Sequence, residues 1–165
     1  MVKSPHLLNL GNPRKVKYEL SSILDKSALE TIENEIARNA ISLFSVGLGH
    51  YRFAMKQTAP NWRQKVSRLY YSAYSVSRAV RLFTSGEYST DVGDHQRFDK
   101  LPDDFPSKAR FANQLAVLRE DRNTCDYDHK CHARDLVLGT RNAALLVKDF
   151  LEKAENYLKN KGLKV

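Results

Sequence analysis

The chain has 165 residues, of which 42% are hydrophobic and 28% are charged, a balance typical of one soluble globular domain. Lysine and arginine outnumber aspartate and glutamate by 27 to 19, and the net charge of +8 favours an anionic partner, with nucleic acid first, over a merely solubilising surface. Two cysteines are too few for a disulfide framework, the N-terminus lacks the apolar run of a signal peptide, and no stretch approaches the roughly 18 apolar residues of a membrane span, so we expect a cytoplasmic protein without a membrane span.

The first predicted element is a basic N-terminal arm over residues 1–26. Pro5, Gly11 and Pro13 interrupt regular structure in this stretch. A short helix over residues 16–24 is compatible with the sequence. We expect the main fold to begin after this arm.

A long helix is predicted from Ser27 to about Gln57. Residues 27–30 (Ser-Ala-Leu-Glu) have the form of a capping box at its start. Apolar or small residues then recur at steps of three and four, as on one face of a helix; they are Leu29, Ile32, Ile36, Ala40, Leu43 and Gly47. Gly47 and Gly49 are expected to weaken this helix in the middle.

The second long helix is predicted to start after Pro60 and to end at Gly86, with Asn61 and Gln64 as its cap. Its buried face is predicted to comprise Val66, Leu69, Tyr70, Ala73, Val76, Val80 and Phe83. The tyrosines at 70, 71 and 74 are interpreted as core residues, in preference to base-stacking platforms, because they follow the helical stripe.

Basic residues occupy the remaining surface of the second helix. They are Arg63, Lys65, Arg68, Arg78 and Arg81. We expect these side chains to be solvated and, together with the N-terminal arm, to contact RNA.

Residues 86–106 form a predicted loop, because they show no periodicity and contain Gly93, Pro102 and Pro106. A loop of this length is uncommon in a compact domain and is often functional. His95 lies in it and is an outside candidate for catalysis, although a loop histidine is more often a surface or capping residue.

Two further helices complete the predicted fold. The third starts at Pro106 and Ser107, and the fourth runs from about His132 to Asn160. The fourth has an apolar stripe of Val137, Ala144, Val147, Leu151, Ala154 and Leu158. With no alternating strand pattern, the sequence predicts an all-α antiparallel bundle of four main helices over residues 27–160. A short N-terminal helix can precede the bundle, and a tail over 161–165 follows it.

Polar residues continue an apolar stripe near the end of the third helix. Phe111, Leu115 and Leu118 recur at steps of four and three, and the same steps lead to Arg122 and, after Cys125, to His129. At about 100° per residue, Arg122 and His129 would share the face of Phe111 if the helix ran that far. Such a conflict with the pattern is often found at functional sites.

Two other interpretations of this stretch remain open. Arg122 can pair with Asp126 one turn later, with His129 capping or ending the helix. Alternatively, Cys125, His129 and His132 can present three zinc ligands on one helical face.

Three segments resemble the HEPN domain family, a group of compact helical proteins common in toxin–antitoxin and defence systems. They are residues 69–74 (Leu-Tyr-Tyr-Ser-Ala-Tyr) followed by 79–83, residues 95–98 (His-Gln-Arg-Phe) ahead of Phe105, and residues 118–128, in which an arginine is followed by Asp-Tyr-Asp. The resemblance covers about residues 28–160. It implies a compact bundle of the predicted kind.

The resemblance also implies an activity, because many members are metal-independent endoribonucleases that act as toxins or defence effectors. Their signature is an arginine, an adjacent polar residue and a histidine a few residues later, which Arg122, Asn123 and His129 match with six residues between Arg122 and His129. The Asp-Tyr-Asp form also occurs in members with no demonstrated activity. A catalytically inactive HEPN module that binds RNA or a partner protein is therefore the alternative.

The resemblance implies RNA and a second copy of the chain as partners, with an antitoxin or a nucleotidyltransferase as a further candidate. Some toxins of the family are silenced when such a transferase modifies a tyrosine two residues after the histidine, and Cys131 occupies that position. Neither a metal nor another cofactor is expected.

The three signature residues suit RNA cleavage chemically. His129 can take the proton of the ribose 2′-hydroxyl, since imidazole titrates near neutral pH. Arg122 can bind two phosphate oxygens with its planar guanidinium, and Asn123 can orient the substrate. Seven residues of helix span about 10.5 Å, so we expect a homodimer whose twofold axis brings two copies of the motif into a composite active site.

Overall fold

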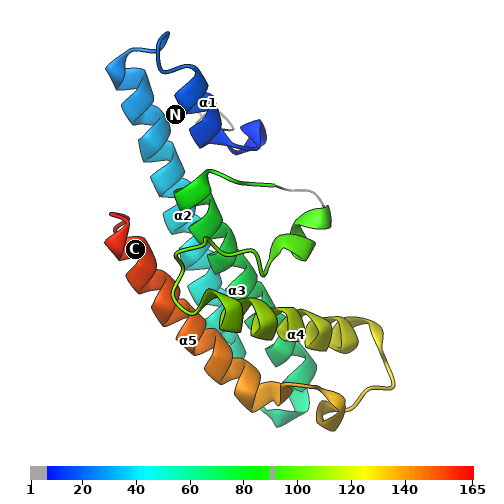
Figure 1. Cartoon of the computed structure of the whole chain (residues 1–165). Coiled ribbons are helices and arrows are strands. Elements are labelled where there is room, and N and C mark those ends of the chain that lie inside the picture. Colours follow the sequence, from blue (N-terminus) through cyan, green and yellow to red (C-terminus); the bar gives the residue numbers. More distant parts are fainter. Residues whose placement is uncertain (1–6, 90–91) are drawn as a thin grey trace.

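The computed structural model describes residues 7–89 and 92–165 of the chain (Figure 1). Within these ranges the fold is all-α and contains no strand, as the sequence predicts. A short helix, α1 (Pro13–Glu19), precedes four long helices: α2 (Lys26–Met55), α3 (Trp62–Ser85), α4 (Lys108–Tyr127) and α5 (Gly139–Asn160). Short 3-10 helices lie between them: η1 (Leu7–Leu10), η2 (Ala59–Asn61), η3 (Val92–Arg97) and η4 (Ala133–Asp135). Pro5 of the predicted arm and residues 90–91 of the predicted loop lie outside the described residues.

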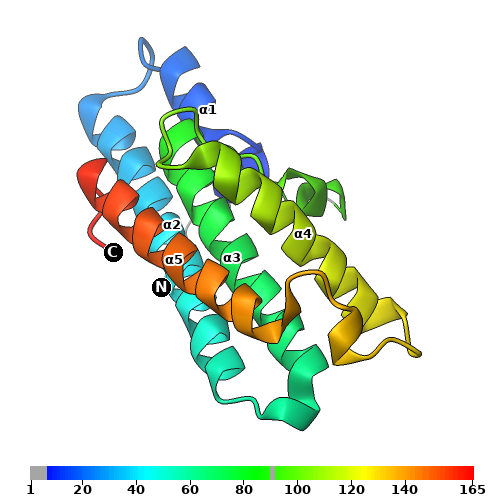
Figure 2. The same ribbon diagram turned by 60° about the horizontal axis from the view of Figure 1, so that its bottom comes forward.

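The four long helices pack together, and each runs opposite to the one before it (Figures 1 and 2). Helix α3 is the central element, because it packs against α2, α4 and α5. None of the helices in the described ranges is long and apolar enough to cross a membrane. The packing of the four long helices confirms the predicted helical bundle.

The closest approach of α2 and α3 depends on Gly47. A Cβ atom on this residue would lie 2.6 Å from Cγ2 of Val76 and 2.9 Å from the backbone oxygen of Ser72. A side chain at this position would hold the helices apart. Gly47 therefore serves packing, and α2 continues unbroken through it and through the exposed Gly49.

The starts of α2 and α3 lie close to the predicted positions, but the predicted caps are wrong. Asp25, and not a capping box at 27–30, caps α2, and its carboxylate accepts a hydrogen bond of 2.7 Å from the Ala28 amide. Asn61 precedes α3 but makes no capping hydrogen bond with its side chain. The predicted end of α3 is confirmed, since Gly86 takes the left-handed conformation, with φ 74°, that glycine allows.

Helix α5 begins at Gly139, seven residues later than the predicted His132. The buried carboxylate of Asp121 on α4 accepts hydrogen bonds from the amides of Val137 and Leu138, at 2.8 and 2.9 Å. Because these two amides donate to Asp121, they are not available for helical hydrogen bonds, and the helix begins only after them. A long-range contact therefore overrides the local helical pattern.

The described part of the N-terminal arm is docked on the bundle. Arg14 donates from Nε to the carbonyl of Phe83 at 2.9 Å, and Lys17 pairs with Glu33 at 2.8 Å. The helix in this segment, α1, starts and ends earlier than the predicted 16–24. Two of the basic residues expected to extend toward RNA thus form contacts within the chain.

The predicted 86–106 loop is held against α3 by its apolar residues. Phe98, Leu101 and Phe105 are buried in the core. The Ser77 hydroxyl donates to the carbonyl of Phe98 at 2.8 Å. This anchoring places η3, which carries His95, beside the tyrosines of α3.

Replacement of Gly47 by alanine is expected to lower the free energy of unfolding by about 1–3 kcal/mol, because the new methyl group overpacks the contact with α3. The matched control is Gly49→Ala in the same helix, where an added Cβ meets nothing within 4 Å. That change should stabilise the protein by about 0.5–1 kcal/mol through the helical preference of alanine. Urea unfolding measures both, and stabilisation by both alanines would contradict the close approach of α2 and α3.

Candidate functional site

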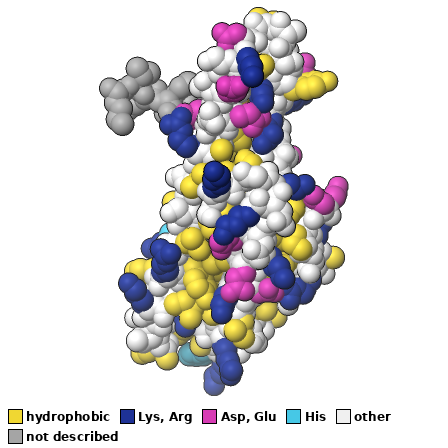
Figure 3. Space-filling view, turned by 90° about the vertical axis from the view of Figure 1, so that its left-hand side faces the viewer, with side chains coloured by type: hydrophobic (Ala, Val, Ile, Leu, Met, Phe, Trp, Pro, Cys, Tyr) yellow, Lys and Arg dark blue, Asp and Glu magenta, His cyan; other side chains and the backbone are white. Residues whose placement is uncertain are grey.

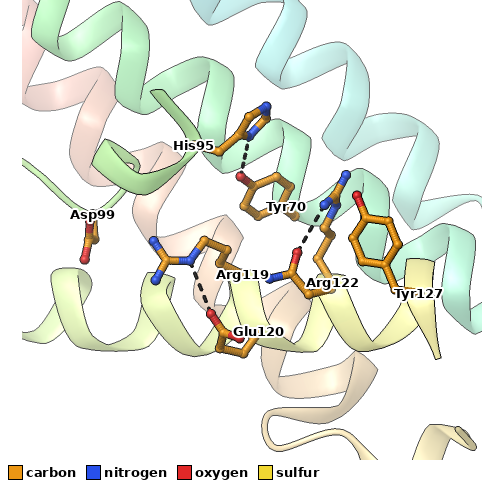
Figure 4. A pocket seen from close by; sticks show the side chains of 8 residues that line it. Tyr70, His95, Asp99, Arg119, Glu120, Arg122 and Tyr127 are labelled. Carbon is orange, nitrogen blue, oxygen red and sulfur yellow. Dashed lines mark hydrogen bonds and ion pairs between the residues drawn. The ribbon is translucent and has the colours of Figure 1, made fainter. Parts of the chain in front are cut away.

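A cleft of about 750 Å³ opens between α4, α3 and the η3 segment (Figure 4). It is lined by Tyr70, His95, Asp99, Arg119, Glu120, Arg122, Asn123 and Tyr127. Of the three predicted catalytic residues, Arg122 and Asn123 lie in this cleft, whereas His129 does not line it. The cleft thus joins part of the predicted site to residues that the sequence did not single out.

The Arg122 guanidinium is held by polar contacts on each side. It donates to the Tyr71 hydroxyl at 2.8 Å and to the Asn123 side-chain oxygen at 3.1 Å. Its Nε lies 2.8 Å from the Asp126 carboxylate as an ion pair, without the geometry of a hydrogen bond. The expected pairing of Arg122 with Asp126 is therefore confirmed, whereas the residue that caps the end of α4 is Asp128 and not His129.

These contacts keep Arg122 charged. Burial is the largest single influence and lowers its pKa, but the Tyr71 hydrogen bond and the Asp126 carboxylate outweigh burial and raise the pKa above its ordinary value. The rings of Tyr70, Tyr71 and Tyr127 also lie 5.4 to 5.6 Å from the guanidinium carbon, within the range of cation–π attraction. Arg122 thus presents a fixed positive charge at the wall of the cleft.

His95 reaches the same cleft from η3. Its Nδ1 lies 2.7 Å from the Tyr70 hydroxyl, and its ring stacks on Tyr74 with centroids 4.4 Å apart. Burial raises the pKa of Tyr70 well above its usual value, with Arg122 acting in the opposite direction. The phenol therefore keeps its proton and can donate it to His95, so that the imidazole is oriented by a buried partner.

His129 lies away from the face of Arg122, and the expected helical alignment of the two is wrong. Helix α4 ends at Tyr127, and Asp128 has the extended backbone conformation, with φ −99° and ψ 96°. The Asp128 carboxylate then accepts a hydrogen bond from the Lys130 amide at 2.9 Å, which turns the chain. His129 is exposed on this turn.

The end of α4 also removes the zinc alternative. Beyond Tyr127 the chain leaves the helix, so His129 and His132 do not share a helical face with Cys125. Among the described residues, no three histidine, cysteine or acidic side chains are placed to hold a metal ion.

Arg63, predicted to contact RNA, instead clamps the turn after α4. It donates to the carbonyl of Cys125 at 2.6 Å and to that of Cys131 at 2.7 Å. Both thiols are buried, and burial raises the pKa of Cys125 to about 12. The guanidinium, which also lies 4.6 Å from the Trp62 ring, thus joins the two ends of the turn.

The other basic residues of α3 are less exposed than expected. Arg81 is only 5% exposed, so the prediction that it is solvated is wrong. Arg78 donates to the Ser89 carbonyl at 2.7 Å and lies over the Tyr88 ring. Arg68 lies over an aromatic ring of α2, and Lys65 is half-buried. The cause is the central position of α3, which leaves it little free surface.

Arg119 is one of the cleft residues that were not predicted from the sequence, together with Asp99, Glu120 and Tyr127. Arg119 lies one turn before Arg122 on α4, and its Nε donates to the Glu120 carboxylate at 3.3 Å. Its side chain is 26% exposed. The available signal was its spacing of three residues from Arg122, which puts both guanidinium groups on one helical face.

No protein-family model matches this chain, and comparisons with curated proteins and with solved structures also find no match.

Arg63→Lys is expected to destabilise the protein by about 1–3 kcal/mol, because one ammonium group cannot bridge two carbonyls and leaves a part-buried acceptor unpaired. The matched control is Arg68→Lys on the same helix, where the guanidinium lies over the Phe53 ring. Thermal unfolding should separate the two variants clearly. Equal stability of both would show that the turn after α4 does not need the clamp.

Proposed function

We propose that this chain is a HEPN-type helical module that binds the RNA backbone in the cleft between α4 and η3. One observation carries the proposal: the three segments that resemble the HEPN family are far apart in the sequence but meet at this cleft. The first contributes Tyr70 and the second His95, while the third contributes Arg122, Asn123 and Tyr127. Such convergence supports a common function for the three segments.

Two guanidinium groups support a phosphate ligand in the cleft, which Asp99 and Glu120 also line. Guanidinium groups are weakly hydrated and present paired donors that match phosphate oxygens. Arg122 is held in place by Tyr71 and Asn123, and Arg119 is the more exposed of the two, at 26% against 15% of the side chain. We assign the first contact with phosphate to Arg119 and the fixed positive field behind it to Arg122.

One side of the molecule carries charges of both signs. On the side shown in Figure 3, lysine and arginine side chains are interspersed with acidic ones, and hydrophobic side chains form a patch among them. Although the net charge is +8, that side presents no uniform basic surface. Arg63 and Arg78 donate to backbone carbonyls and Arg81 is buried. We therefore assign RNA binding to the cleft in preference to the basic residues of α3.

RNA affinity is expected to fall steeply as salt rises, because phosphate contacts release counterions. Arg119→Gln should weaken binding at all salt concentrations and reduce the slope of log affinity against log salt by about 0.7 to 1. Arg110→Gln is the matched control, since Arg110 is also an ion-paired arginine of α4 but does not line the cleft. Fluorescence anisotropy measures both, and equal losses, or affinity independent of salt, would contradict binding in the cleft.

A metal-independent endoribonuclease is the second candidate function. The observation that favours it is the imidazole of His95 in the same cleft as Arg122. In such a reaction a base takes the proton of the ribose 2′-hydroxyl, and the freed oxygen attacks the phosphorus. The bond from phosphorus to the 5′-oxygen breaks, and that oxygen takes up a proton. The products are a 2′,3′-cyclic phosphate and a 5′-hydroxyl, while Arg122 stabilises charge on the phosphoryl oxygens.

His95 and His129 are the two candidates for the catalytic base. His95 lines the cleft within one chain, whereas His129 would need a second copy of the chain to reach such a site. The proposed homodimer is supported by large hydrophobic side chains exposed on α2 and α5, a feature of protein contact surfaces; they include Ile41, Val46, Phe53, Met55 and Leu145. The toxin or defence role, with an antitoxin or nucleotidyltransferase partner, belongs to this same proposal.

If the protein cleaves RNA, His95→Ala and Arg122→Ala are each expected to reduce the rate by about 10²- to 10⁴-fold, the range of general acid–base groups. His129→Ala should have little effect, and Arg122→Lys should not restore activity, because a point charge cannot make the two-pronged contact. EDTA should leave the rate unchanged, since the base is a side chain. Product analysis should find the cyclic phosphate.

A large loss of cleavage rate in His129→Ala, with little loss in His95→Ala, would instead favour the composite site of a homodimer. Sedimentation would test for that homodimer directly. If the wild-type protein leaves RNA intact, the ribonuclease proposal fails and the binding module remains. Circular dichroism of each variant controls for loss of helix, which matters most for His95 because it packs on Tyr74.

A further inference from the structure

Tyr127 is an exposed aromatic residue at the rim of the cleft. It is the last residue of α4 and lines the cleft, yet 75% of its surface is open to solvent. Its ring lies beside the Arg122 guanidinium, 5.6 Å from the guanidinium carbon (Figure 4). The ring therefore lies next to the guanidinium of Arg122, and most of its own surface is open to solvent.

Tyr70, the other tyrosine that lines the cleft, cannot offer a free ring face. Tyr70 is 1% exposed and is packed against Tyr71, Tyr74 and Phe98. Tyr70 forms part of the wall of the cleft, Tyr71 does not line it, and Tyr127 stands at its opening. Within the described part of the cleft, Tyr127 is thus the aromatic ring on which a flat ligand group can lie.

The distances along α4 suit one nucleotide with its flanking phosphate. Arg119 and Tyr127 are eight residues apart on the same helix, which corresponds to about 12 Å along the axis. Arg122 lies between them in the sequence and also lines the cleft. A volume of about 750 Å³ is in the range of sites that enclose a small ligand. A base on Tyr127 and a phosphate at Arg119 can therefore be bound together.

We propose that Tyr127 is a base-stacking residue, which receives one unpaired RNA base while Arg119 binds the adjacent phosphate. This role rests on the proposed RNA binding and adds to it a residue that contacts the base. Stacking needs a free base face, so the ligand must be single-stranded at this nucleotide. Stacking discriminates little between the four bases, because each base has an aromatic face.

The test compares two probes, a single-stranded RNA of about ten nucleotides and inorganic polyphosphate, which has phosphates but no bases. Tyr127→Ala is expected to weaken RNA binding by about 5- to 100-fold, as loss of one base–aromatic stack does, and to leave polyphosphate binding unchanged. Tyr127→Phe should bind RNA nearly as well as the wild type, because it keeps the ring. Arg119→Gln should weaken the binding of both probes.

Tyr18→Ala is the matched control, because Tyr18 lies on α1 and is exposed to a similar extent, 78%. It should leave the binding of both probes unchanged. Equal weakening of RNA and polyphosphate by Tyr127→Ala would show that Tyr127 acts through Arg122, which overturns the stacking role while RNA binding stands. A wild-type protein that binds no RNA would overturn both the proposed function and this role.

Discussion

The burial of α3 by three other helices is the constraint from which the rest of the structure follows. Helix α3 packs against α2, α4 and α5, and its polar side chains must find partners inside the protein. Ser77 binds the carbonyl of Phe98, and Tyr70 binds His95. Both partners belong to the segment that links α3 to α4, so these hydrogen bonds hold that segment against the bundle. The cleft exists because η3 is held there.

The same burial explains why the basic residues of α3 stabilise the fold instead of forming a binding surface. Arg63 bridges the carbonyls at the two ends of the turn after α4, and Arg81 is buried. A guanidinium group can be placed in a protein interior when its donors meet carbonyl oxygens or aromatic rings. The charge that remains available to a ligand then lies mostly on other elements, and Arg119 of α4 is the clearest example in the cleft.

The proposed site combines a rigidly held group, Arg122, with two more accessible groups, Arg119 and Tyr127. Arg122 is fixed by Tyr71, Asn123 and Asp126, so its charge is already oriented before a ligand arrives, which reduces the entropy lost on binding. Arg119 and Tyr127 are the more accessible groups and are the ones assigned to contact phosphate and base. His95 combines both properties, because it is stacked on Tyr74 and bonded to Tyr70 but still lines the cleft.

The all-α class, the four long helices and the end of α3 at Gly86 could be predicted from the sequence alone. Helical periodicity and the glycine cap are local properties, set by residues a few positions apart. The stripe through Phe111, Leu115 and Leu118 also led to Arg122, which lines the cleft. The end of α4 before His129, the late start of α5 and the burial of Arg81 were decided only by tertiary structure. Asp121 of α4 binds the amides before α5, and Arg63 of α3 binds both ends of the turn after α4. Arg81 is buried because three helices surround α3. The presence of His95 and Arg122 in one cleft is of the same kind, because it requires the folding of the 86–106 segment onto Tyr70, which no local pattern encodes.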